Sequence, residues 1–525
     1  MNPDALTALI GSHDLRQWLA LYAASVTGLV SGLLIARAPP SRRWSAPLIA
    51  IPATVMSAVL MTMLGRVIMH ITPDPTRIAS ILEFAGPVLA AALAALVGIA
   101  GARQRGDQAV KRGTVILDAP RSARPRSGHL TLAGQPVPPA DEAKHFKMIG
   151  TTGTGKSTAI RELLGGALRR GDRAVIADPD GGYLRQFYDP TRGDVILNPF
   201  DPRAHAWNPY GEIIHAHDVE QLARSLIPDH DGSDRSWRGY ARTFFTAVAR
   251  QTFDAGIRDL AELHRLLTCA SIEELRILTT GTPAQPFLEG GNERMFGSIR
   301  SVTGSQLTAL EYLATQPGPR VAVRDWVRRG RGVLFMPYRA NEIAALRSVI
   351  SAWLRLAIFE CMNQEEGDQR LWFVVDELDA LGVIDGLKDA LARLRKFGGR
   401  CVLGFQSIAQ VSSTYGQGEA QTIVENCGNS LILRCSSSEN GGTARFASKL
   451  IGEREVIRPT ISRSRRSGLF VEPHQSVSRG EQHVLESAVL PAEIEQLPDL
   501  NGYLKFASSA AWLRVRLDLA QPTPR

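Results

Sequence analysis

The stretch Gly150-Thr-Thr-Gly-Thr-Gly-Lys-Ser157 decides the fold of the region around it. It fits the pattern G-x-x-x-x-G-K-[ST], whose glycines let the backbone curl so that its N–H groups face phosphate oxygens. Residues 145–149 before it are typical of a short strand, and residues 158–168 after it have helical composition and spacing. The pattern requires this strand–loop–helix context, so the sequence predicts a nucleotide-binding loop.

The residues of this loop have distinct expected roles. The start of the following helix adds the positive end of a dipole, which favours an anion. We expect Lys156 to reach the β- and γ-phosphates of ATP and the Ser157 hydroxyl to bind Mg²⁺. The predicted nucleotide-binding residues are Gly150, Thr151, Thr152, Gly153, Thr154, Gly155, Lys156, Ser157 and Thr158.

A second apolar stretch, Leu371-Trp-Phe-Val-Val-Asp376-Glu377, ends in two acids. Five apolar residues in a row suit a strand that is buried on both faces of a parallel sheet. The carboxyl end of such a strand lies at the edge where ligands bind. We expect Asp376 to hold Mg²⁺ through water and Glu377 to polarise the attacking water. The alternative is a solvated strand end.

A third stretch, residues 400–405, leads to Gln406. In RecA-like motors a glutamine at this place senses the γ-phosphate. A simple C-cap or turn residue is the alternative for Gln406. Residues 387–397 between the last two strands read as a basic helix. Arg395, with Arg393 as its rival, is the candidate for an arginine finger that acts on a neighbouring subunit's ATP. A solvated basic face explains the same pattern.

Further apolar stretches suit strands of the same sheet. They are Arg173–Asp178, which is followed by the turn 179–182, then Gly332–Met336 and Ser430–Arg434. Helical stretches separate these strands. The alternation predicts an α/β fold with a mostly parallel sheet covered by helices on both faces.

The first hundred residues differ from the rest of the chain. Trp18–Ala36, Trp44–Leu64 and Ile81–Ala102 are apolar runs, and only Glu83 interrupts the third. Each is close to the roughly 20 residues that cross a bilayer. Basic residues follow the first and third runs, which places both of these ends in the cytoplasm. The prediction is a multi-pass anchor of two or three helices in a bacterial inner membrane, with the large C-terminal part cytoplasmic.

Composition sets wider bounds on the function. The chain has 525 residues, a formal charge of +8 and five scattered cysteines without a CxxC pair. The cysteine pattern argues against a disulfide framework or a zinc site. The positive charge permits binding to a polyanion but does not require it. The basic connector between residues 103 and 147 suits anionic lipid headgroups and nucleic acid equally well.

Several motifs together give the chain a family resemblance. It resembles the conjugative coupling proteins of type IV secretion systems, the TrwB/TraD kind, over about four-fifths of its length. The segments that carry the resemblance are Gly150–Thr158, Val175–Gly182, Asn198–Asp201, Trp207–Pro209, Phe373–Asp379, Gly404–Ser407 and Leu490–Pro498. The nucleotide motifs are shared with other motors, whereas the additional segments and the N-terminal anchor are specific to these proteins.

The resemblance implies a RecA-like motor domain, a homo-hexameric ring and DNA in a central channel. It also implies a relaxase or relaxosome and the subunits of a type IV secretion channel as partners. The implied domains are a transmembrane anchor (1–104), the first part of the nucleotide-binding domain (105–206), an inserted all-α domain (207–316) and the second part of the nucleotide-binding domain (317–525). Helical spacing within 207–316 agrees independently with the inserted domain.

The expected function is therefore ATP-driven translocation of DNA at a bacterial inner membrane. A motor for protein effectors, a chromosome pump of the FtsK type and a structural subunit with a vestigial ATP site are the alternatives. The segment Ile457–Gln482 carries several arginines among serines and glycines. This composition predicts a flexible loop, either facing DNA or forming a surface insertion.

Overall fold

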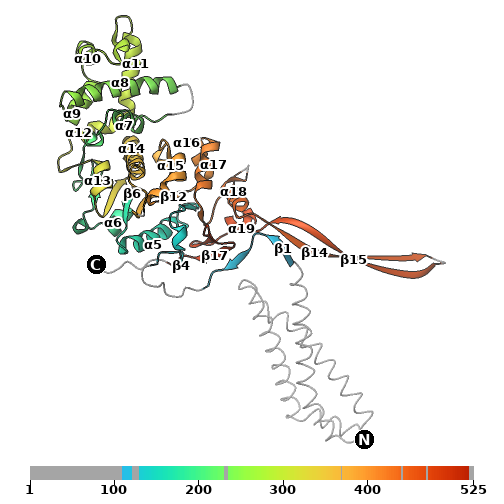
Figure 1. Cartoon of the computed structure of the whole chain (residues 1–525). Coiled ribbons are helices and arrows are strands. Elements are labelled where there is room, and N and C mark those ends of the chain that lie inside the picture. Colours follow the sequence, from blue (N-terminus) through green and yellow to red (C-terminus); the bar gives the residue numbers. More distant parts are fainter. Residues whose placement is uncertain are drawn as a thin grey trace, which may run out of the picture. The chain divides into compact units, whose positions relative to one another are not determined.

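The computed structural model describes residues 109–120, 129–229, 234–367, 369–438, 441–468 and 471–518 (Figure 1). The three predicted membrane segments lie outside these residues. Within the described ranges, no helix combines the length and the apolarity that a bilayer crossing needs. Two compact units make up the chain, one of residues 1–111 and 455–484 and the other of residues 112–454 and 485–525.

The larger unit contains a ten-stranded sheet in the order β2-β17-β16-β13-β5-β12-β11-β6-β10-β7. The strands from β13 to β7 run parallel, whereas β16 is antiparallel to both of its neighbours. All the predicted strands lie in the parallel part, so the expected mostly parallel sheet is confirmed. The strands are β2 (Ile116–Asp118), β5 (Phe146–Ile149), β6 (Arg173–Pro179), β7 (Val195–Ile196), β10 (Val333–Tyr338), β11 (Leu371–Val375), β12 (Gly399–Phe405), β13 (Asn429–Ile432), β16 (Asn501–Lys505) and β17 (Trp512–Arg516).

The apolar run of β11 is explained by burial on both faces of the sheet. Every residue of the strand is buried. Trp372 packs in one core with Leu163 of α5 (Lys156–Arg169), and Phe373 packs in a second core with Leu354 of α14 (Ile343–Met362). Helices therefore cover both faces, as the uninterrupted apolar pattern predicts.

Seven further helices that the structure describes belong to the larger unit. They are α6 (Gly182–Phe187), α13 (Val323–Arg329), α15 (Leu387–Arg393), α16 (Ile408–Tyr415), α17 (Gln417–Asn426), α18 (Gly442–Ile451) and α19 (Pro491–Glu495). Small pieces are the pairs β3 (Thr131–Leu132) with β4 (Gln135–Pro136) and β8 (Ala206–Trp207) with β9 (Arg320–Val321), and the 3-10 turns η4 (Pro209–Glu212) and η7 (Leu394–Phe397).

A group of helices lies between β8 and β9 in the sequence, within the segment expected to be an all-α domain. Because β8 and β9 pair in parallel, the chain leaves and re-enters the part that holds the ten-stranded sheet at adjacent positions. Trp237 is half-buried against the apolar core, and Arg242 forms an ion pair with Asp229. The helices are α7 (Asp218–Leu226), α8 (Arg235–Asp254), α9 (Leu260–Thr268), α10 (Ile272–Leu278), α11 (Glu293–Gln306) and α12 (Thr308–Ala314).

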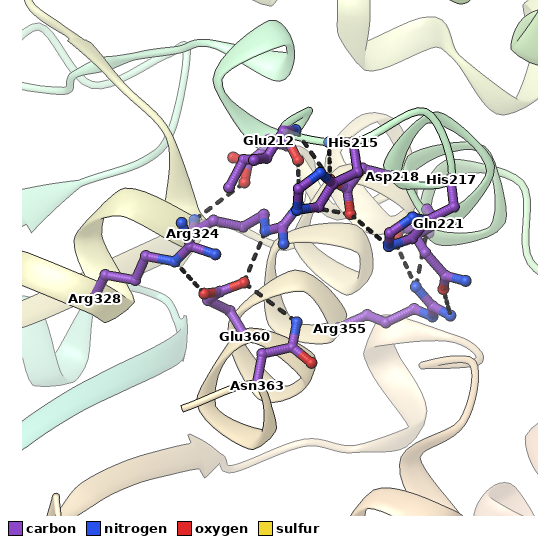
Figure 2. A network of polar contacts seen from close by, with 12 residues as sticks. Glu212, His215, His217, Asp218, Gln221, Arg324, Arg328, Arg355, Glu360 and Asn363 are labelled. Carbon is purple, nitrogen blue, oxygen red and sulfur yellow. Dashed lines mark hydrogen bonds and ion pairs between the residues drawn. The ribbon is translucent and has the colours of Figure 1, made fainter. Parts of the chain in front are cut away.

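A buried polar network, termed here the base network, joins these helices to α13 and α14 (Figure 2). The Arg324 guanidinium lies 2.8 Å from Asp218 of α7 and 2.7 Å from Glu360 of α14. The Glu212 carboxylate accepts hydrogen bonds from the backbone N–H groups of Val323 and Arg324. The network thus fixes the first helix of the insertion against two helices that pack near the sheet.

The segment Ile457–Gln482 is not a flexible loop, so that prediction is wrong. It forms most of a long hairpin of β14 (Glu453–Gly468) and β15 (Val471–Ser487), with β1 (Ala109–Gly113) on the other side of β14 (Figure 1). Across the hairpin, the Thr460 hydroxyl donates to the Gly480 carbonyl at 3.1 Å. Backbone pairing needs no apolar side chains, and this polar segment lacks the alternating apolar face that identifies a strand in a sequence.

Candidate nucleotide site

Three neighbouring strands bring the predicted site residues to one edge of the sheet. β12 lies between β5 and β11, with Phe405 opposite Ile149 and Leu403 opposite Val375. The glycine-rich loop, the acids Asp376–Glu377 and Gln406 follow the carboxyl ends of these strands. Parallel strands end at a common edge, so these three segments meet although they are far apart in the sequence. We call this edge of the sheet, with the loop 150–157, Asp376, Glu377 and Gln406, the nucleotide edge.

The loop between β5 and α5 is shaped by glycine and closed by a threonine. Gly153 and Gly155 have φ angles of 77° and 115°, which side chains disfavour. A Cβ atom at Gly155 would also lie 2.9 Å from the side chains of Leu500 and Leu517. The Thr154 hydroxyl donates to the Thr151 carbonyl at 2.7 Å. The loop therefore presents backbone N–H groups and the first turn of α5 to an anion.

Lys156 is buried at the start of α5. Its ammonium donates to the carbonyls of Gly150 at 2.6 Å and Thr151 at 3.3 Å. Burial lowers the pKa of Lys156, and the charges of Asp376 and Glu377 oppose that shift. A buried cation beside two acids suits the recognition of a phosphate and its metal.

Asp376 directs its two carboxylate oxygens differently. The Ser157 hydroxyl donates to Oδ2 at 2.6 Å, and the Tyr183 hydroxyl donates to the same oxygen at 2.8 Å. Oδ1 is buried and has no hydrogen-bond partner among the residues that the structure describes. A buried carboxylate oxygen without a partner is costly. It fits a bound cation or its water, and hard oxygen atoms from a hydroxyl and a carboxylate are the ligands that Mg²⁺ prefers.

Glu377 and Gln406 form a chain that returns to the loop. The Gln406 amide donates to the Glu377 carboxylate at 3.1 Å, and the Thr152 hydroxyl donates to the Gln406 carbonyl oxygen at 2.9 Å. Burial raises the pKa of Glu377, and the nearby charge of Asp376 raises it further. A carboxylate with a raised pKa is suited to accept a proton from water.

Arg395 is the one predicted catalytic residue that the structure does not bring to this edge. It is exposed in η7, which directly precedes β12, and so lies at the opposite, amino-terminal edge of the sheet. Its rival Arg393 is exposed at the end of α15 on the same side. Neither side chain can serve the site of its own chain from there.

Two polar residues at the nucleotide edge were not predicted. Tyr183 contacts Asp376 as described above, and its backbone N–H donates a hydrogen bond to the Asp178 carboxylate at 3.0 Å. Burial raises the pKa of Asp178 to about 6. Tyr338 ends β10. Within the described ranges of the chain, its buried hydroxyl has no hydrogen-bond partner, and neither has the Oδ1 atom of Asp379. The sequence predicted the turn that follows Asp178 but neither tyrosine, because tyrosine belongs to none of the nucleotide-binding motifs.

One family model and several curated proteins are similar to this chain. The model of the family "Type IV secretion-system coupling protein DNA-binding domain" matches residues 129–518. Coupling protein TraD of Escherichia coli (strain K12) is 32% identical over 417 residues, which cover 77% of this chain and 57% of TraD. VirD4 of Bartonella henselae is 29% identical over 46% of this chain and 38% of its own length. The chain thus spans little more than half of the length of TraD and less than half of the length of VirD4.

Solved structures of the plasmid coupling protein TrwB resemble the chain over most of its length. TrwB in complex with ADP and Mg²⁺ is 32% identical, with a TM-score of 0.69 over 80% of this chain and 96% of TrwB. TrwB in complex with the non-hydrolysable ATP analogue ADPNP is also 32% identical, with a TM-score of 0.70. This likeness and the observed sheet agree with the expected RecA-like fold.

Proposed function

The chain belongs to the type IV secretion-system coupling proteins, and we propose that it is an ATP-driven motor that moves DNA into a secretion channel. The observation that carries the proposal is the shared edge of the sheet. This edge holds the glycine-rich loop, Lys156, Asp376 and Glu377. Among the described residues, the buried Oδ1 atom of Asp376 has no hydrogen-bond partner. The relatives of this fold whose structures were solved with ADP and Mg²⁺ or with ADPNP support ATP and Mg²⁺ as its ligands.

The residues of the edge divide the chemistry between them. Lys156 and the loop N–H groups bind phosphate oxygens, while Ser157 and Asp376 hold Mg²⁺. Bound Mg²⁺ neutralises negative charge on the phosphates. Glu377 orients a water molecule and receives its proton, which requires the carboxylate to be ionised. Gln406 joins Glu377 to Thr152, so it can report a change in the loop to the water-activating group.

The remaining parts of the proposal concern assembly. Arg395 and Arg393 lie at the edge of the sheet away from their own nucleotide site. An arginine finger from either residue must therefore act on a neighbouring copy, which a homo-hexameric ring would allow.

The proposal also includes an N-terminal anchor in a bacterial inner membrane and a relaxase–DNA complex as cargo. DNA contacts in such a motor are mainly to phosphate, so they are independent of sequence and weaken with salt.

The test is ATP hydrolysis by the purified full-length chain in detergent, with and without single- or double-stranded DNA. We expect DNA to raise the rate and added salt to abolish the increase. Lys156→Ala should show no hydrolysis under either condition, whereas Lys449→Ala, an exposed lysine on α18, should match the wild type. Hydrolysis that no DNA stimulates at any salt concentration would contradict translocation.

A further inference from the structure

The turn after β6 supplies a hydroxyl to the acid that ends β11. Tyr183 donates to Asp376 Oδ2 at 2.8 Å, and Ser157 donates to the same oxygen at 2.6 Å. Both hydroxyl groups thus donate to one carboxylate oxygen, and no described residue donates to the other one, Oδ1. The terminal torsion of an aspartate is soft. Two donors on one oxygen therefore decide which oxygen is presented to a ligand.

Tyr183 is itself held in place from two sides. Its side chain is buried, with 1% of its surface exposed. The Asp178 carboxylate accepts the backbone N–H groups of Tyr183 at 3.0 Å and Leu184 at 2.7 Å, which fixes the start of α6. The guanidinium of Arg161, from α5, lies over the tyrosine ring, 5.4 Å from its centroid. The hydroxyl is therefore preorganised before any ligand arrives.

The tyrosine side chain can act only as a donor toward an ionised carboxylate. A phenol keeps its proton at physiological pH, so the Tyr183 hydroxyl donates to Asp376 Oδ2. Carboxylates that bind metals are commonly oriented by hydrogen bonds of this kind from outside the ligand set.

We propose that Tyr183 is a positioning residue that orients Asp376 so that Oδ1 faces the Mg²⁺ of bound ATP. The inference rests on the proposed function, because it assumes that this edge binds Mg²⁺ and ATP. It assigns a role to the segment Val175–Gly182 and the residue after it, which the nucleotide motifs leave unexplained. Asp178 acts one step further away, by holding the backbone of Tyr183.

The experiment measures binding of a fluorescent ATP analogue to the full-length chain, with saturating Mg²⁺ and separately with EDTA. Tyr183→Phe keeps the ring and its contact with Arg161 but removes the hydroxyl. We expect it to weaken binding with Mg²⁺ by about tenfold, the usual effect of losing a partner of a metal ligand. Binding in EDTA should equal that of the wild type. Tyr188→Phe, at the end of the same helix and outside the Asp376 contacts, is the matched control and should change neither value.

A second variant guards against a folding defect. Asp178→Asn leaves one acceptor for two N–H groups, so we expect a smaller loss in the same direction, again only with Mg²⁺. Equal Mg²⁺-dependent binding by Tyr183→Phe and the wild type would overturn the inference, as would an equal loss in EDTA. If the wild type binds the analogue no better with Mg²⁺ than with EDTA, the proposed function fails instead.

Discussion

The nucleotide edge and the base network are both polar and buried, but they satisfy their acids differently. In the base network, Glu360 accepts hydrogen bonds from Arg324 on one oxygen and from Arg328 on the other. Glu212 accepts three N–H groups across its two oxygens. At the nucleotide edge, the described part of the chain supplies two donors to one oxygen of Asp376 and none to the other.

This difference separates a structural cluster from a binding site. Buried polar groups are normally paired, because an unpaired group loses its hydration without compensation. A closed network such as that of Glu360 gains nothing from a ligand. An open acid such as Asp376, placed beside a buried lysine, gains a partner when a cation and an anion bind together. Substitutions in the two regions should therefore affect different properties of the protein.

The largest expected effect is on hydrolysis. Lys156→Ala should lower the ATPase rate by about 1000-fold or more, because it removes the charge that we propose binds the phosphates. The urea concentration at the midpoint of unfolding should change little. The hydrogen bonds of the lysine to described residues go to two loop carbonyls, and water can replace the ammonium there. A large loss of stability together with residual ATPase activity would contradict the assignment of Lys156 to a binding site rather than to a structural cluster.

The next largest effect is on stability. Glu360→Gln removes the negative charge between two arginines and should lower the free energy of unfolding by about 3–5 kcal/mol. Urea unfolding followed by tryptophan fluorescence reports this change, because Trp207 and Trp353 pack together in the same core. Glu366→Gln, an exposed residue soon after the same helix, is the control. ATP binding by folded Glu360→Gln should equal that of the wild type.

A third prediction concerns pH. Burial lowers the pKa of His145, at the amino end of β5, to about 4, whereas an unfolded histidine titrates near 6.5. The unfolded chain therefore takes up the proton first as the pH falls. Stability that is complete above pH 6.5 should decrease by about 3 kcal/mol between pH 6.5 and 4. His145→Gln should flatten this part of the curve, and an unchanged slope would show that other groups cause it.

The smallest effect is expected one residue from the base network. Arg329 forms an ion pair with Asp325 at 2.7 Å, but both side chains are at least half exposed. Arg329→Ala should cost less than about 0.5 kcal/mol, because solvent screens such a pair. Arg328→Ala, which leaves buried Glu360 with one partner fewer, should cost more in the same unfolding measurement. Equal values would mean that burial does not distinguish these pairs.

The local patterns of the sequence predicted the edge of the sheet well. The loop 150–157 and the run 371–377 are short motifs whose chemistry depends on consecutive residues. Gln406 was predicted for the same site from the apolar stretch that precedes it, and its amide contacts Glu377. Long apolar runs likewise predicted the buried strands, because burial on both faces leaves a continuous signal.

Contacts between distant residues left no comparable signal. Glu212 and Arg324 are 112 positions apart, and no pattern links them in a single sequence. Tyr183 reaches Asp376 across 193 positions for the same reason. The hairpin of β14 and β15 was missed because its polar sequence lacks an apolar face. Arg395 stays a prediction, since its role depends on a second copy of the chain.

The most direct measurement is an experimental structure of the full-length Glu377→Gln chain with ATP and Mg²⁺. We expect this variant to hydrolyse ATP slowly, so that the bound triphosphate persists. We predict triphosphate density against the loop 150–157 and a metal ion, or its water, at Asp376 Oδ1. Tyr183 should keep its hydrogen bond to Oδ2. A nucleotide bound elsewhere, or an Asp376 Oδ1 that remains without a partner beside a bound triphosphate, would contradict the assignment of this edge as the motor's ATP site.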